Sequence, residues 1–133
     1  MTARHQILFV DDDPEDHLIM LDYFRDFGKD DQIIFRKNGQ EAIRYLEQLP
    51  DDLLLPNLIV LDLNMPILNG TQTLIEIKRN KRLKHIPVII FSTSENENEK
   101  RKCLSFGALD YLVKPSSFAE GLKVIEKFAA FIF

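Results

Sequence analysis

The sequence is poor in cysteine, with Cys103 as the single example among 133 residues. One cysteine cannot form an internal disulfide, so we expect the chain in a reducing compartment. Cys103 falls in a stretch with helical spacing and has no histidine near it in sequence. We therefore predict that it is a small core residue rather than a reactive thiol.

Long apolar runs are also missing. No run approaches the roughly 20 residues that a membrane-spanning helix requires. Residues Met1 to Gln6 lack the hydrophobic core of a signal peptide. We therefore expect a cytoplasmic protein with no membrane partner.

The sequence has no excess of positive charge, since its formal net charge is −4. A nucleic-acid partner is not expected, because binding to a phosphate backbone needs a basic face. The glycine-rich motifs of nucleotide-binding proteins are absent as well. Basic residues cluster in one place, which we interpret as the solvated end of a helix: Lys78, Arg79, Lys81, Arg82 and Lys84.

What the sequence does contain is the ordinary mixture of a globular protein, with 45% hydrophobic and 29% charged residues. Its length fits one hydrophobic core. We see no linker or repeat and expect a single domain over residues 1–133, without a DNA-binding output domain.

Five short apolar runs recur along the chain and are rich in Ile, Val and Leu. Such runs are typical of strands that are buried on both faces of a parallel sheet. They are Ile7–Val10, Ile33–Phe35, Leu58–Leu61, Val88–Phe91 and Tyr111–Val113.

Amphipathic stretches with helix-start signals lie between these runs. The signals are Asp13-Pro14-Glu15-Asp16, Asn38-Gly39-Gln40-Glu41, Ser94-Glu95-Asn96-Glu97 and Ser117-Phe118-Ala119-Glu120. Strand and helix therefore alternate five times. This alternation predicts the α/β class, with an open parallel sheet and helices on both of its faces.

Polar residues follow several of the predicted strands directly. Ligands of open α/β sheets bind beyond the carboxyl ends of the strands. There the sequence places the acidic pair Asp11 and Asp12, then Asp62, Ser92 and Lys114. Asp13 is interpreted as a helix cap.

Three carboxylates in one pocket would repel one another, and burial would favour their neutral form. A hard divalent cation resolves both problems, and Mg²⁺ prefers oxygen ligands such as Asp11, Asp12 and Asp62. An aspartate can also accept a phosphoryl group, while a lysine and a serine hydroxyl can bind phosphoryl oxygens. The pattern predicts a Mg²⁺-dependent phosphoryl-accepting site with Asp62, Lys114 and Ser92 in catalytic roles.

These residues lie in segments that closely resemble the receiver domain of bacterial two-component response regulators. The matching segments are ILFVDDDP (7–14), LIVLDLNMP (58–66) with Asn69-Gly70, PVIIFS (87–92) and GALDYLVKP (107–115). The resemblance covers essentially the whole chain. It implies the flavodoxin-like fold with strand order 2-1-3-4-5.

The resemblance also implies a role for each matching residue. Asp62 is the phosphoacceptor, Asp12 binds Mg²⁺ directly, and Asp11 does so mainly through water. The backbone carbonyl of Asn64 completes the metal site, and Lys114 pairs with the phosphoryl group. The Lys114–Pro115 bond is expected to be cis, as is usual in the family.

The resemblance further implies a switch in which Ser92 moves toward the phosphoryl oxygens and Tyr111 turns inward. The implied partners are a sensor histidine kinase, hybrid kinase or phosphotransfer protein, and a downstream protein target. The opening Asp13-Pro14-Glu15-Asp16 looks most like stand-alone receivers that partner phytochromes and hybrid kinases. The protein would be no enzyme beyond its own phosphorylation and dephosphorylation.

Two alternative functions and the place of the C-terminal residues stay open from the sequence. Asp11-Asp12-Asp13 also fits haloacid-dehalogenase-type phosphatases, although Asp62 would then have no role. A receiver that acts only as a scaffold, independently of phosphorylation, is a second alternative. The apolar tail Phe131-Ile132-Phe133 is expected on the domain's own core, or else on a partner or in a homodimer.

Overall fold

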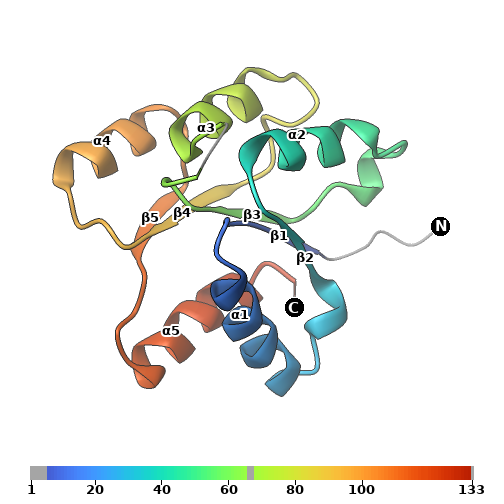
Figure 1. Ribbon diagram of the computed structural model, residues 1–133. Coiled ribbons are helices and arrows are strands. Elements are labelled where there is room, and N and C mark those ends of the chain that lie inside the picture. The colour runs from blue at the N-terminus through green and yellow to red at the C-terminus, as the bar shows by residue number, and fades with distance from the viewer. Residues whose placement is uncertain (1–5, 66–67, 133) are drawn as a thin grey trace.

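The structure is a computed structural model that describes residues 6–65 and 68–132. Strands and helices alternate along this part of the chain (Figure 1). The strands are β1 (Ile7–Val10), β2 (Ile33–Arg36), β3 (Leu58–Leu61), β4 (Val88–Ser92) and β5 (Asp110–Val113). The helices are α1 (Pro14–Asp26), α2 (Gly39–Gln48), α3 (Gly70–Arg79), α4 (Glu97–Ser105) and α5 (Phe118–Ala129), with two 3-10 turns at Asp30–Gln32 and Asp52–Leu54.

The strands form one parallel sheet in the order β2-β1-β3-β4-β5, which confirms the predicted fold class and topology. Every residue of β1, β3 and β4 is buried, as expected for strands that are covered on both faces. The strand order changes direction at β1 and β3. Ligand sites of open α/β sheets form at such a switch point.

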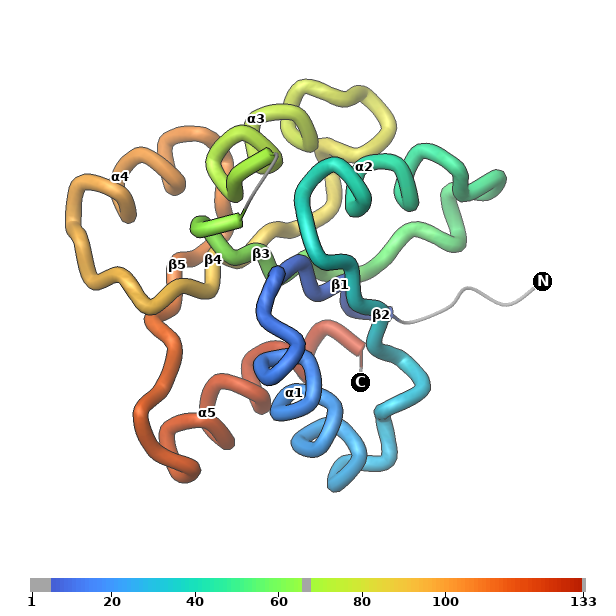
Figure 2. Tube along the Cα trace, in the orientation of Figure 1, coloured from blue at the N-terminus to red at the C-terminus, as the bar shows by residue number. Residues whose placement is uncertain are grey.

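Helices cover both faces of the sheet. Figure 1 shows α1 and α5 on one face and α2, α3 and α4 on the other, and the tube in Figure 2 shows the crossovers that connect them. On the α1/α5 face, the ring of Phe9 packs edge to face against Phe24 and Phe128, with centroids 6.0 and 5.7 Å apart. Edge-to-face packing at this spacing suits the charge distribution of aromatic rings.

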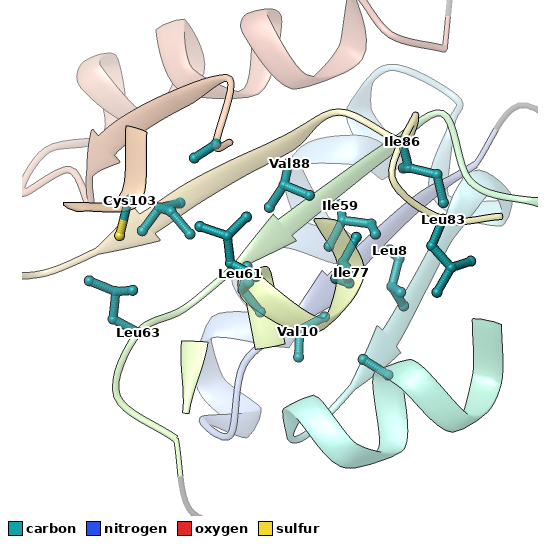
Figure 3. Close-up of a cluster of buried hydrophobic side chains, with 14 of the residues drawn as sticks. Leu8, Val10, Ile59, Leu61, Leu63, Ile77, Leu83, Ile86, Val88 and Cys103 are labelled. Carbon is teal, nitrogen blue, oxygen red and sulfur yellow. The ribbon is translucent and has the colours of Figure 1, made fainter. Parts of the chain in front are cut away.

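The core on the opposite face is aliphatic. Figure 3 shows Ile77 of α3 among the strand residues Leu8, Ile59 and Leu61. Cys103 of α4 joins the same cluster with 1% of its surface exposed, and burial raises the pKa of its thiol. The prediction of a core cysteine is therefore confirmed.

Three of the predicted helix starts are confirmed by hydrogen bonds. The side chains of Asp13, Asn38 and Ser117 accept the backbone N–H groups that a cap is expected to satisfy. The prediction for α4 was two residues early. Asn96 is the cap, because its side chain accepts two N–H groups, whereas Ser94 only accepts the N–H of Asn96 itself.

The predicted solvated basic cluster is wrong for two of its members. Arg82 donates to the backbone carbonyls of Leu46 and Leu49 and pairs with Asp52. Lys78 donates to the carbonyls of Lys84 and Ile86. Carbonyls at helix ends and turns need donors, and long basic side chains supply them here.

The tail after α5 packs against the domain itself. Ile132 is 3% exposed within the α1/α5 core, and Phe131 packs against the same cluster. Phe133 of the tail and Pro66 of the segment LIVLDLNMP lie outside the described residues. Among the residues described, no helix has the length and apolar character needed to cross a membrane.

Candidate phosphoryl-acceptor and metal site

The sheet brings Asp11 and Asp62 to the same rim. Val10 pairs with Leu61 at the ends of β1 and β3, so the next residue of each strand leaves the sheet at the same level. The backbone N–H of Asp62 donates to the carbonyl of Val10 at 2.9 Å, which extends the ladder by one residue. The two carboxylates therefore start from adjacent points of a rigid scaffold.

Asp12 completes an acidic cluster with them. Ligand oxygens of Asp11, Asp12 and Asp62 all lie within 4.8 Å of one another. Asp11 and Asp62 are 7% and 8% exposed, whereas Asp12 is exposed. Three converging carboxylates form an oxygen-donor set that suits a hard divalent cation with water at its open side.

Lys114 reaches the same cluster from the end of β5. Its backbone N–H donates to the carbonyl of Ser92 at 2.7 Å, which holds this strand end beside β4. The ammonium nitrogen lies 2.8 Å from Asp11 Oδ2 and 3.8 Å from Asp62 Oδ2. It is therefore hydrogen-bonded to Asp11 but only ion-paired with Asp62.

The clustered charges shift the pKa values of the site. Burial raises the pKa of Asp62 from the usual 3.8 to about 6; Lys114 opposes the shift and the charge of Asp11 adds to it. Burial also raises the pKa of Asp11, against its hydrogen bond with Lys114. Burial alone would lower the pKa of Lys114, but its hydrogen bonds with Asp11 and Asp16 raise it above the ordinary value. A bound cation would stabilise the ionised form of these buried carboxylates and so lower their pKa values.

The turn after Asp62 needs a glycine to close. Gly70 begins α3, and its N–H donates to the carbonyl of Leu63 at 3.0 Å. A side-chain carbon on Gly70 would lie 2.6 Å from the Cα of Leu63, which is closer than packed atoms allow. The backbone N–H groups of Asn64 and Leu63 face the Asp62 carboxylate and lower its pKa against burial. Asn64 itself is exposed, and the role of its backbone carbonyl as a metal ligand stays a prediction.

Ser92 and Tyr111 form a second group behind the rim. Ser92 is fully buried, and its hydroxyl accepts the N–H of Ser94 at 3.2 Å. The Tyr111 hydroxyl donates to the carbonyl of Ser94 at 2.9 Å, and the residue is 5% exposed. The Tyr111 ring therefore already lies inward in this structure.

Two residues of the site were not predicted. Asp16 of α1 binds the Lys114 ammonium with Oδ2 at 2.7 Å. The ring of His17 stacks on Phe35 with centroids 4.6 Å apart, and its Nε2 lies 2.6 Å from the carbonyl oxygen of Asp11. Both follow a helix cap, where sequence patterns favour a role in the helix and give no signal for a contact with a distant strand end.

One expectation from the resemblance is wrong. No cis peptide bond occurs in the described residues, so the Lys114–Pro115 bond is trans. The trans form of an X–Pro bond is favoured by about 0.5–1 kcal/mol. Lys114 reaches the carboxylates from the trans form, so its contacts do not require the rarer isomer.

Comparison with known proteins agrees with this geometry. Residues 7–126 match the family of response regulator receiver domains. The chain is 32% identical to the response regulator Rcp1 of Synechocystis over 127 residues, which cover 94% of this chain and 86% of that protein. The crystal structure of the Mn²⁺-bound form of Rcp1 superimposes with a TM-score of 0.79 at 29% identity, covering 96% of this chain and 93% of the other.

Two further solved structures bear on the site. The phosphorylated cyanobacterial phytochrome response regulator RcpA has a TM-score of 0.80 at 27% identity, covering 96% of this chain and 94% of its own. The receiver domain of the Pseudomonas aeruginosa sensor histidine kinase PA1611 has magnesium in its active-site cleft. Its TM-score is 0.72 at 25% identity, covering 96% and 99% of the two chains.

The matched segment, the strand order and the acidic cluster agree with one another. They leave the haloacid-dehalogenase interpretation without support, since that alternative gives Asp62 no role while the structure places Asp62 inside the cluster. The chain belongs to the response regulator receiver family.

Proposed function

We propose that the protein accepts a phosphoryl group on Asp62 from a histidine kinase and signals through the resulting change of shape. The observation that carries this proposal is the meeting of three chain segments at one rim. The Asp62 carboxylate lies within 4.8 Å of Asp11 and Asp12 oxygens and 3.8 Å from the Lys114 nitrogen. Phosphoryl transfer needs positioned charges of this kind and little other chemistry.

Mg²⁺ is the proposed cofactor. Asp11, Asp12, Asp62 and the backbone carbonyl of Asn64 would hold it, and the all-oxygen donor set with raised carboxylate pKa values fits such an ion. Related receivers are known in Mn²⁺-bound and magnesium-bound forms. When bound, the ion supplies positive charge that neutralises phosphoryl oxygens in the transition state.

The protein's own groups have distinct tasks in the transfer. The ionised Asp62 carboxylate attacks phosphorus, so that an O–P bond forms while the bond from phosphorus to the donor breaks. Lys114 pairs with a phosphoryl oxygen as a point charge, because its ammonium group already faces Asp62. Ser92 would donate its hydroxyl to another phosphoryl oxygen.

The readout would use Ser92 and Tyr111. Tyr111 already lies inward, held by Ser94, so phosphorylation would stabilise this arrangement rather than create it. Movement of Ser92 would release the N–H of Ser94 and alter the start of α4. The face formed by α4, β5 and α5 would then carry the signal to a downstream protein.

The remaining features are part of the same proposal. The protein acts as a receiver domain in the cytoplasm and catalyses only its own phosphorylation and dephosphorylation. Its partner is a sensor kinase, hybrid kinase or phosphotransfer protein, and the likeness to RcpA favours a kinase of the phytochrome type. A homodimer would be one form of the signalling state.

Labelling with acetyl phosphate tests the proposal. We expect the wild-type protein to gain one phosphoryl group in a Mg²⁺-dependent way, as measured by intact mass. Asp62→Asn should abolish the gain. Asp51→Asn should leave it unchanged, because Asp51 caps the 3-10 turn that precedes β3, whereas Asp62 follows the other end of this strand. Labelling that persists in Asp62→Asn would contradict the assignment, and a wild-type protein that is never labelled would support the scaffold alternative.

A further inference from the structure

Asp16 makes the shortest ion pair to the Lys114 ammonium. Its Oδ2 lies 2.7 Å from the nitrogen, compared with 2.8 Å for Asp11 and 3.8 Å for Asp62. The proposed phosphoacceptor is therefore the most distant of the three acids around this lysine. Two of the three ammonium hydrogens are engaged away from Asp62.

The start of α1 leaves Asp16 available for this contact. In a capping box, a Glu or Gln side chain at the third helical position accepts the backbone N–H of the capping residue. In this structure the N–H of Asp13 donates to Asp11 Oδ1 at 3.0 Å instead. The carboxylate of Asp16 is thus directed toward the end of β5, 98 residues along the chain.

Asp16 can also release the lysine at little cost. Its side chain is 30% exposed, whereas those of Asp11 and Asp62 are 10% and 9% exposed. It borders a cleft that is also lined by Lys114, Pro115 and Ser116. Water in this cleft can solvate the carboxylate once its partner has moved, which avoids the penalty of an unpaired buried charge.

We propose that Asp16 is a positioning residue that holds Lys114 away from Asp62 and competes with the phosphoryl group for its ammonium. This inference rests on the proposed function of the site and adds a residue that tunes it. In the unphosphorylated protein Lys114 is bound to Asp11 and Asp16. On phosphorylation it turns to a phosphoryl oxygen, and Asp16 is left to solvent.

Loss of Asp16 has two effects, and both favour the phosphorylated state. Removal of the Asp16 carboxylate frees a donor of Lys114, and it also removes a negative charge close to an incoming anion. A partly exposed ion pair contributes up to about 1 kcal/mol, which corresponds to roughly a three- to fivefold change in an equilibrium constant. The phosphorylated state should accordingly be favoured by that factor when Asp16 is lost.

Calorimetric titration with beryllofluoride, a phosphoryl mimic, tests the inference at saturating Mg²⁺. We expect Asp16→Ala to bind the mimic about three- to fivefold more tightly than the wild type. Glu15→Ala is the matched control, because it removes the exposed neighbouring acid of the same helical turn. It should change the affinity by less than about twofold, as screened surface charges do.

Asp16→Glu serves as the rescue variant and should return the affinity toward that of the wild type. A separate titration with Mg²⁺ alone keeps changes in metal affinity apart from changes in mimic affinity. Equal or weaker mimic binding by Asp16→Ala, relative to Glu15→Ala, would overturn the inference while leaving the proposed function intact. A wild-type protein that binds no beryllofluoride would refute the proposed function itself.

Discussion

Lys78 and Lys114 are both partly buried lysines, but they lie at opposite rims of the sheet and bind different kinds of partner. Lys78, near the end of α3, donates to two neutral backbone carbonyls. Lys114, at the end of β5, donates to two carboxylates. Burial lowers the pKa of Lys78, whereas the carboxylates raise the pKa of Lys114 above its ordinary value despite burial.

The two lysines mark two different rims of the sheet. The structural rim is where the helices lead into the strands, and the acidic rim is where the strands end. Where the helices lead into the strands, Lys78 and Arg82 donate hydrogen bonds to backbone carbonyls of turns and helix ends, which serves the fold itself. Where the strands end, Asp11, Asp16 and Asp62 lie around the Lys114 ammonium. Asp12 lies beside Asp11 and Asp62, so negative charge is in excess at this rim. Such uncompensated charge lowers the stability of the fold. A rim that keeps it is therefore where a ligand is expected to bind.

Substitution of the two lysines should give the largest difference in effect between the two rims. We expect Lys114→Met to weaken beryllofluoride binding about 100-fold, since a charge-assisted hydrogen bond to the phosphoryl oxygens is lost. Lys78→Met should leave the affinity unchanged and lower stability, because the carbonyls of Lys84 and Ile86 lose their donor. Calorimetry measures the first effect and urea unfolding the second. Equal affinities for the two variants would remove the functional distinction between the rims.

The charge at the acidic rim should also be visible as pH-dependent stability without metal. The pKa of Asp62 in the folded protein, about 6, lies above its unfolded value near 3.8. The folded state therefore binds this proton more tightly, and the free energy of unfolding falls as the pH rises from about 4 to 6. Asp62→Asn removes this loss and should stabilise the metal-free protein by roughly 1–3 kcal/mol at pH 7.

The sign of that effect depends on pH and on metal. At pH 4 the wild type carries the proton, so the two proteins should unfold at similar urea concentrations. Saturating Mg²⁺ should stabilise the wild type more than the variant, because binding to the native state alone favours folding. If Asp62→Asn is no more stable than the wild type at pH 7 in EDTA, the ionised Asp62 carboxylate does not destabilise the folded protein.

The fold could be predicted from sequence because its signals are local. Continuous apolar runs marked β1, β3 and β4, and the caps Asp13 and Ser117 marked the starts of α1 and α5. The acids of the rim could be predicted for the same reason. Residues that directly follow parallel strands must meet at one edge of the sheet, wherever they lie in the sequence.

The contacts that the sequence did not predict come from helices and turns. The direction in which a side chain leaves a helix depends on how the helix packs, so Asp16 was indistinguishable from any other acid in a first turn. The inward position of Tyr111 depends on the carbonyl of Ser94, a partner that no motif encodes. The trans Lys114–Pro115 bond is likewise a feature that the resemblance did not predict.

Arg82 gives the smallest of the expected effects and tests the structural rim directly. It donates to the carbonyls of Leu46 and Leu49 at the end of α2, while its pair with the exposed Asp52 adds little. We expect Arg82→Ala to lower the free energy of unfolding by about 1–2 kcal/mol, since partly buried carbonyls lose their donor. Lys81→Ala, at the exposed neighbouring position, should stay within about 0.5 kcal/mol of the wild type. Because the two rims are separate, beryllofluoride affinity should be unaffected in both variants, and a large change in Arg82→Ala would show that the rims are coupled.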